Sequence, residues 1–153
     1  MTPYCDRGDL ETIFGVNNVA RWADLDNDES ELVISRRIEW ACQWATEFVN
    51  SRLQYGHYAV PFSPVPTLIR DLTAMYAGIT LYDGRQVVSA DENDKVSRQR
   101  KDFDRYLRQI HKGQLKLFDP TTDLPVTIQD ESAPFVEPDT TDDDEEEWET
   151  VIL

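Results

Sequence analysis

The chain has 153 residues, of which 40% are hydrophobic and 29% charged, proportions typical of one globular domain with a buried core. No apolar run approaches the roughly 20 residues of a membrane span, and the N-terminus, MTPYCDRGDL, lacks the form of a secretory leader. Cys5 and Cys42 are too few for a disulfide framework, so we expect reduced thiols in a cytosol-like compartment.

Charge is divided unevenly along the chain. Residues 1–118 carry 17 acidic and 15 basic side chains, whereas residues 119–153 carry 13 acidic side chains and no basic one. We therefore expect a nearly neutral body over residues 1–118 and an extended acidic C-terminal arm over residues 119–153. The overall acidity of the protein belongs to the arm.

The first two expected helices are short. The segment DRGDLETIFG has Asp6 as a suitable N-cap and Gly15 as the glycine that follows its last turn. The segment NNVARWADLD predicts a second helix, capped by Asn17 or Asn18 and apolar on one face.

The third expected helix is the longest and runs from Ser30, its N-cap, to about Gln54. Trp40 and Trp44 form a second apolar stripe beside the main one. A helix that is apolar on two flanks is expected to pack against more than one neighbour. The main stripe, with members mostly three or four apart, consists of Ile34, Ile38, Ala41, Ala45, Phe48 and Leu53.

A corner rich in proline follows in the stretch GHYAVPFSPVPTLIR, residues 56–70. Each proline fixes its own φ at about −65° and holds the preceding residue in an extended conformation. Pro66 suits the first turn of the next helix, which we expect at about 66–82. The sequence therefore predicts a stiff connection between two helices.

The rest of the body completes an all-α fold. The stretch YDGR, residues 82–85, predicts a turn. A last helix is expected from about Asp91 to Lys112, ending at Gly113, and QLKLF is expected to form one short strand. Together these elements predict a small all-α bundle of four to five helices.

The stretch DLDNDESELVIS, residues 24–35, matches a calcium loop only in part. Aspartates stand at its first, third and fifth positions. Glu29 replaces the glycine of the sharp turn, and Ser35 replaces the bidentate glutamate. We interpret the stretch as a polar turn whose carboxylates favour the start of a helix.

The sequence carries no constellation typical of an enzyme. His57 and His111 are far apart and have no histidine or cysteine at ligand spacing. A Gly-rich phosphate loop, a nucleophile elbow and a paired metal motif are all missing from the sequence. We expect a protein that is not an enzyme, with no catalytic residue, no cofactor and no metal site.

The last expected helix carries one basic stripe, for which three interpretations stay open. It contacts phosphates of DNA passing nearby, it docks on an acidic partner such as the arm of a neighbouring copy, or it is a solvated face relieved by Asp102 and Asp104. Its members, three and four apart and so on one side of the helix, are Arg98, Lys101, Arg105, Arg108 and Lys112.

The arm ends in TTDDDEEEWETVIL. An acidic run alone indicates a solvated segment, but this one finishes on aromatic and aliphatic side chains. Such a terminus inserts in a partner's groove or adds a strand to a partner's sheet, and the acidic run steers it toward basic surface. The apolar residues of this tip are Trp148, Val151, Ile152 and Leu153.

Four segments occur in a familiar order: YCDRGDLETIFG, RRIEWACQWATEFVNSRL, YAVPF...VPTLIRDLTAMYAGITLY and the basic last helix. In this order they resemble the small helical head–tail connector (head-completion or neck) proteins of tailed bacteriophages, with the Mu-like branch as the nearest. The resemblance covers residues 1–118, and its most specific part runs from Tyr55 to Tyr82. The arm is longer and more charged than this family leads us to expect, so the resemblance assigns it no role.

The resemblance implies a structural virion protein that is made in the host cytoplasm and located at the phage neck. It implies a ring of about twelve subunits beneath the portal that extends the DNA channel. The implied partners are copies of the chain, the portal protein, a tail-side connector or tail terminator protein and the packaged DNA, with no membrane. Tyr55, Tyr58 and Phe62 are then interface anchors on a preorganised corner; the alternative is that they cap the bundle core.

Two other classes of function remain as alternatives. One is a nucleic-acid-binding regulator that uses the basic last helix and binds DNA in a salt-dependent manner as the free protein. The other is an acidic DNA-mimic inhibitor, whose activity would depend entirely on residues 137–153.

Overall fold

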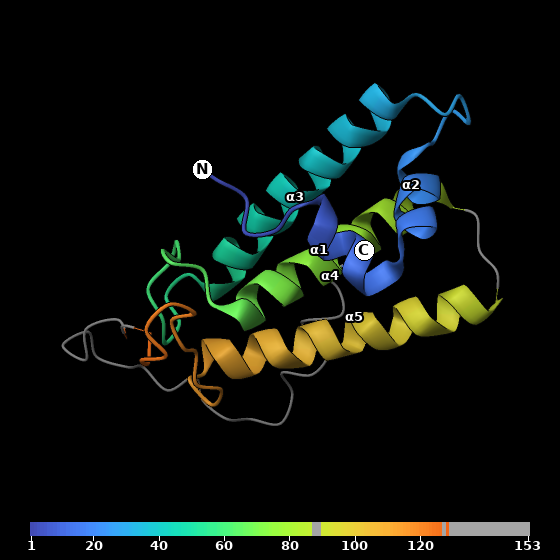
Figure 1. Ribbon diagram of the computed structural model, residues 1–153. Coiled ribbons are helices and arrows are strands. Elements are labelled where there is room, and N and C mark those ends of the chain that lie inside the picture. The colour runs from blue at the N-terminus through green and yellow to red at the C-terminus, as the bar shows by residue number, and fades with distance from the viewer. Residues whose placement is uncertain (87–89, 127, 129–153) are drawn as a thin grey trace.

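The computed structural model describes residues 1–86, 90–126 and 128, and over this part of the chain it contains five helices and no strand. The prediction of a small all-α bundle is confirmed. In Figure 1, α4 runs between α3 and α5, and α1 and α2 pack beside it. The helices are α1 (Arg7–Phe14), α2 (Val16–Ala23), α3 (Glu31–Leu53), α4 (Thr67–Arg85) and α5 (Ala90–His111).

The first two helices meet at a single glycine. Asp6 caps α1 with a full capping box, since its side chain accepts from the Asp9 N–H and the Asp9 carboxylate accepts from the Asp6 N–H. Gly15 has a φ of 89° and is both the C-cap of α1 and the N-cap of α2. The expected cap at Asn17 or Asn18 is therefore wrong, because the chain turns at Gly15 and both asparagines lie inside α2.

The long helix α3 has the expected bounds, with Ser30 at its N-cap. The predicted stripe is buried apart from Phe48, which is half-buried, and Cys42, Thr46 and Val49 join the buried side. The α3 helix contacts α2, α4 and α5, so its buried side chains pack against several helices.

The end of α4 differs from the expectation. Residues 82–85 continue the helix instead of forming a turn, so that prediction is wrong. Two side chains of this last turn have partners elsewhere. Asp83 accepts from Arg100 of α5 at 2.8 Å, and the Arg85 guanidinium donates to the Asn27 side chain at 2.5 Å. These contacts stabilise a turn that the YDGR stretch alone does not favour.

The last helix, α5, ends as expected just before Gly113, which has a φ of 71°. The predicted strand over QLKLF is wrong, because the described residues contain only isolated bridges, Phe118 with Pro125 and Tyr58 with Ile128. The Val126 N–H donates to the Leu117 carbonyl at 2.9 Å. The described beginning of the arm thus turns back on the body beside the proline corner.

Two hydrophobic cores share the bundle. The α1–α2 core lies where α1 and α2 meet α3 and α4, and includes Leu10, Phe14, Val19, Trp22, Ile38, Ala41, Ala45, Ala74, Ala77 and Tyr82. The corner core lies beneath the prolines, and includes Tyr4, Val49, Leu53, Tyr58, Phe62, Leu72, Phe103, Ile110 and Leu117. Met75 and Tyr76 of α4 touch both.

Two histidines and two glycines lock the corner to the end of α5. The His57 N–H donates to the His111 carbonyl at 2.9 Å. A Cβ added at Gly56 would lie 2.7 Å from the His111 ring, and one added at Gly113 would lie 2.5 Å from the His57 ring. The His111 ring therefore fills the space that Gly56 leaves open, and the His57 ring fills the space that Gly113 leaves open.

Candidate interaction surfaces

Two of the three predicted corner anchors are buried inside the chain. Tyr58 and Phe62 are each only 5% exposed. The Tyr58 hydroxyl donates to the Leu115 carbonyl at 2.8 Å and accepts from the Leu117 N–H at 3.0 Å. This placement matches the alternative that they cap the core, and in this arrangement neither side chain is accessible to a partner.

The tyrosine at the N-terminus closes the corner from the other side. The Tyr4 hydroxyl accepts from the Phe62 N–H at 2.8 Å and donates to Asn50 Oδ1 at 2.6 Å. Its ring packs edge-on against Phe62, with centroids 6.0 Å apart. Burial is the main reason that the pKa of Tyr4 is raised. The N-terminal segment, the corner and α3 are therefore held as one unit.

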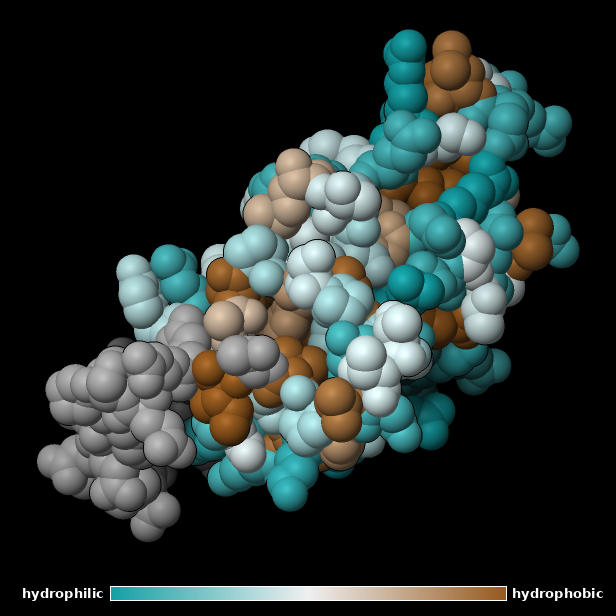
Figure 2. All heavy atoms as spheres, turned by 60° about the vertical axis from the view of Figure 1, so that its left-hand side comes forward, coloured by the Kyte–Doolittle hydropathy of each residue, from teal (hydrophilic) through white to brown (hydrophobic). Residues whose placement is uncertain are grey.

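Tyr55 is the predicted anchor that faces solvent. Its side chain is 85% exposed and its φ is 63°, a left-handed conformation uncommon for a tyrosine. It follows α3 directly and precedes the corner. Figure 2 shows hydrophobic side chains gathered at this end of the body, next to mostly polar surface. Tyr55 thus projects from a rigid support.

The basic stripe lies on the outer side of α5, opposite the buried residues Phe103, Leu107 and Ile110. Arg98, Lys101, Arg105 and Lys112 are exposed, and Arg108 is half-buried. Asp102 pairs with Arg105 at 2.8 Å, as the solvated interpretation expects. Asp104 instead sits toward the core: burial raises its pKa, and Arg108, Arg52 and Arg100 oppose that shift.

A pair of tryptophans on α3 lies open to solvent. Trp40 is 59% exposed and Trp44 is 45% exposed, and their rings stack with centroids 6.1 Å apart and planes 9° apart. The expectation that α3 packs against more than one neighbour is confirmed, since α3 contacts α1, α2, α4 and α5. The two tryptophans nevertheless stay largely exposed in the described part of the chain. Four-residue spacing located the pair, but a sequence cannot distinguish a stripe that packs internally from one that does not.

Beside Trp44, aromatic rings of three helices stack on one another, the half-buried Phe48 and Tyr76 and the buried Phe103. The ring centroids of Phe48 and Tyr76 are 4.3 Å apart, and those of Tyr76 and Phe103 are 4.9 Å apart. Burial raises the pKa of Tyr76, while a hydrogen bond with Trp44 and the charges of Arg100 and Arg52 act in the opposite direction. We call Trp40, Trp44, Phe48, Tyr76, Arg52 and Arg100 the tryptophan face.

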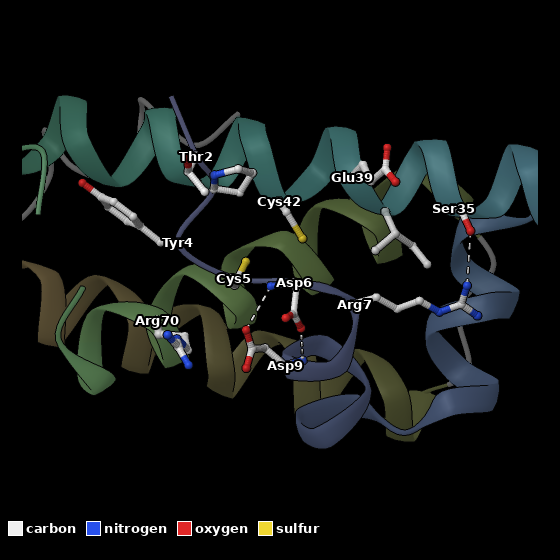
Figure 3. A pocket seen from close by; sticks show the side chains of 12 residues that line it. Thr2, Tyr4, Cys5, Asp6, Arg7, Asp9, Ser35, Glu39, Cys42 and Arg70 are labelled. Carbon is white, nitrogen blue, oxygen red and sulfur yellow. Dashed lines mark hydrogen bonds between the residues drawn. The ribbon is translucent and has the colours of Figure 1, made fainter. Parts of the chain in front are cut away.

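A cavity of about 500 Å³ lies between the N-terminal segment and α3 (Figure 3). Its lining brings Cys5 close to Cys42, and charged side chains such as Asp6, Asp9 and Glu39 stand around them. Both cysteines are buried free thiols. A hydrogen bond with Cys42 and burial raise the pKa of Cys5 far above its ordinary value, so this thiol stays protonated and unreactive.

The loop that partly matched a calcium motif uses its carboxylates within the chain. The Asp24 carboxylate accepts from the N–H groups of Asp28 and Glu29, and Asp26 pairs with Arg37 at 2.9 Å. Among the described residues, no group of three or more histidine, cysteine, aspartate or glutamate side chains is placed to hold a metal ion. None of the described helices is long and apolar enough to cross a membrane.

The predicted apolar tip of the arm, Trp148, Val151, Ile152 and Leu153, lies outside the described residues. The structure thus places two of the predicted groups on the surface, Tyr55 at the corner and the basic stripe on α5, and does not bring them together. It adds the tryptophan face, whose two tryptophans the sequence marked only as an apolar stripe of the third helix.

A family model described as Bacteriophage Mu, Gp36 matches residues 4–134, which is most of the chain. The chain belongs to the bacteriophage Mu Gp36 family. A comparison with curated proteins found no match. Membership in the Gp36 family confirms the Mu-like phage origin that the sequence resemblance implied, and the class of function it supports is a phage structural or assembly protein. The matched region covers the whole helical body and the root of the arm.

Proposed function

We propose that this Gp36-family protein is a structural component of the phage neck. In this role a ring of its subunits lies beneath the portal, joins it to the tail side and extends the DNA channel. The partners are neighbouring copies, the portal protein and a tail-side connector or terminator protein. No catalytic step is part of this role.

The observation that carries the proposal is the corner that presents Tyr55. A ring subunit must hold its contact groups at fixed angles, because freedom lost on assembly weakens the contact. Here the corner is tied to the end of α5 by His57 and to the root of the arm by Tyr58. Tyr55 therefore enters a contact with little ordering cost, and tyrosine is among the residues most effective at interfaces.

Distinct surfaces on separate helices also support the proposal. Neighbours in a ring meet head to tail, so each subunit needs two different complementary surfaces. The described chain offers Tyr55 at the corner, the basic stripe on α5 and the tryptophan face beside α3. An isologous dimer would need only one such surface.

Electron microscopy of the purified protein mixed with portal assemblies of the same phage tests this function. We expect ring-shaped density on the tail-facing side of the portal. Tyr55→Asn removes the exposed ring and suits the left-handed backbone at this position, so it should reduce ring occupancy without unfolding the body. Leu32→Asn is the matched control, since Leu32 is 63% exposed near the start of α3, at the other end of the body.

Phage particles that lack the protein provide the decisive genetic outcome. We expect them to lose packaged DNA or to fail to join tails. Normal genome retention and normal tail joining would overturn the proposed function. Equal ring occupancy for Tyr55→Asn and the unmodified chain would leave the ring in place but reject the corner as its contact.

The exposed stripe on α5 favours a second candidate, a regulator that binds nucleic acid. Lys101 and Arg105 would then neutralise phosphates, and the affinity of the free protein for duplex DNA would fall steeply as salt rises. Lys101→Gln with Arg105→Gln should weaken such binding for all DNA sequences alike. Salt-independent or undetectable binding by the free chain rejects this candidate and leaves the neck role.

A further inference from the structure

We propose that the C-terminal segment of the same chain, residues 142–153, docks on the tryptophan face. The proposal concerns the free protein and does not depend on the neck role. It assigns an occupant to a surface that the described part of the chain leaves uncovered, and a binding site to the apolar tip of the arm.

The surface has the chemistry of a docking site. Trp40 and Trp44 stack into one continuous apolar area, whereas the exposed Leu32 and Leu25 stand apart from them in the chain. Indole rings that face water have hydrophobic area to bury. A segment that brings its own aromatic and aliphatic side chains would cover that area.

The charges beside the tryptophans identify the sign of the occupant. Arg52 lies over the Phe48 ring, with its guanidinium carbon 5.1 Å from the ring centroid. The charge of Arg100 lowers the pKa of the neighbouring Tyr76, against the larger effect of burial. Asp83 pairs with Arg100, and the partly buried Asp104 faces Arg52, Arg100 and Arg108. The basic stripe continues outward along α5. An acidic occupant gains from the cations on the α5 side of the face, whereas on α3 the exposed Glu47 follows Trp44 by three residues and accepts from Gln43 at 2.8 Å.

Residues 142–153 have the matching composition. Their sequence, DDDEEEWETVIL, holds seven carboxylate side chains, no basic one, a tryptophan and three aliphatic residues. Acidic and apolar residues adjoin in this segment just as arginines and tryptophans adjoin on the face. Trp148 can pack on the stacked indoles while the preceding carboxylates lie toward the arginines.

The position of the arm makes the chain's own segment the favoured occupant. Ile128 bridges Tyr58, so the arm leaves the body at the corner, beside the end of α3. From Leu53 back to Trp44 the helix rises by only about 14 Å. The residues between Ile128 and Trp148 span up to about 65 Å when extended. Covalent attachment through a stretch of this length keeps the segment at an effective concentration above that of other copies in dilute solution.

A paramagnetic label at the end of the arm tests the docking in the full chain. We attach it to a Leu153→Cys variant, whose new thiol is distinguished from the native Cys5 and Cys42 because both of those are buried. The readout is the indole N–H signals in the NMR spectrum. We expect Trp40 and Trp44 to lose most of their signal intensity, and Trp22, which is buried in the α1–α2 core, to keep it.

Matched variants separate docking from a passing contact. With the label in place, Trp44→Gln should restore the Trp40 signal, whereas Leu32→Gln should not. Trp148→Ser within the arm should also restore both signals, and Thr150→Ser should leave them broadened. High salt should restore them in part, since the carboxylates contribute to binding.

Two outcomes overturn the proposal. Full intensity at Trp40 and Trp44 in the labelled chain shows that the segment does not occupy the face. The second outcome comes from a mixture of two kinds of chain, one with the paramagnetic label and no isotope enrichment, the other with isotope enrichment and no label. If the tryptophan signals are broadened in this mixture as much as in a chain that carries both, the occupant comes from another copy.

Discussion

The two ends of the body are held together by different kinds of contact. At the α1–α2 end the packing is close around small residues, including Ala74, Ala77 and Gly78 of α4. At the corner end the core is made of large rings, and loops that lie far apart in the chain are joined by the hydroxyls of Tyr4 and Tyr58. The α1–α2 end is stabilised by close packing of side chains, and the corner end by hydrogen bonds between loops.

This difference explains which surfaces are available for contact. Close packing at the α1–α2 end covers its aromatic residues, and Trp22 packs edge-on between Phe14 and Tyr82 with centroids 5.2 and 5.3 Å away. At the corner end the hydroxyl bonds fix the backbone, so Tyr55 is left free to project. Substitutions at the two ends should therefore lower stability for different reasons, lost packing at one end and lost hydrogen bonds at the other.

Gly78→Val should have the largest effect and would sharpen the contrast most. The added Cβ would lie 2.0 Å from the Phe14 ring, which has no room to move in the α1–α2 core. We expect the free energy of unfolding to fall by about 3 kcal/mol or more, measured by urea denaturation. Gly84→Ala in the same helix is the control, because its Cβ meets nothing within 4 Å, and it should stabilise by about 0.5 kcal/mol. Tolerance of valine at position 78 would contradict packing by shape.

Tyr58→Phe tests the other end by removing only a hydroxyl. The buried Leu117 N–H would lose its acceptor and the Leu115 carbonyl its donor. We expect the free energy of unfolding to fall by about 1–3 kcal/mol, with early loss of hydrogen-exchange protection at Leu117. Tyr55→Phe removes the same group from an 85% exposed side chain and should change stability by less than about 0.5 kcal/mol. Equal effects of the two variants would break the contrast.

The helix caps give a smaller and more local test. Asp6→Ala removes the side chain that accepts from the Asp9 N–H, one of the two bonds of the α1 capping box, and should cost about 1 kcal/mol. Ser30 occupies the same position at α3 but makes no side-chain capping bond, so Ser30→Ala should cost only a few tenths of that, about 0.3 kcal/mol. Thermal denaturation of both variants measures the difference. A larger loss for Ser30→Ala would show that α3 depends on its cap more than the geometry indicates.

The smallest expected effect is a dependence of stability on alkaline pH. The raised pKa of Cys5 keeps its thiol protonated in the folded state, whereas in the unfolded chain it ionises near its ordinary value of 9.0. The stabilisation is therefore present below pH 9 and is lost as the pH rises above it. At about pH 9.5 the loss should be about 0.8 kcal/mol. Urea denaturation at neutral and alkaline pH should show a larger loss in the unmodified chain than in Cys5→Ala, in which only the raised pKa values of Tyr4 and Tyr76 still contribute.

The helices were predictable because local signals and burial agree in them. Asp6, Ser30 and Pro66 stand at three of the predicted starts, and the apolar spacing of α3 and α5 gave their buried sides. The errors fall where distant contacts override local ones. The YDGR stretch stays helical because Asp83 and Arg85 find partners in α5 and in the loop before α3.

The candidate surfaces were harder to predict from the sequence. A basic stripe follows from spacing alone, and α5 presents it as expected. Burial of an aromatic residue does not follow from spacing, because it depends on which segments fold over it. From the sequence, Tyr58 and Phe62 suit an interface and the core equally well. They are buried because Tyr4 and the segment after α5 fold over them. Trp40 and Trp44 show the converse, because their spacing marks an apolar stripe but both remain largely exposed in the described part of the chain.

The reciprocal packing of Gly56 with His111 and of Gly113 with His57 carries a consequence for how the protein can change. A smaller residue at the opposite histidine would relieve only the ring clash, because a Cβ at Gly56 also lies 3.0 Å from the His111 carbonyl oxygen and Gly113 has a φ of 71°. Each glycine and the histidine opposite it should therefore be coupled, with the paired substitution recovering only part of the stability that the glycine substitution loses.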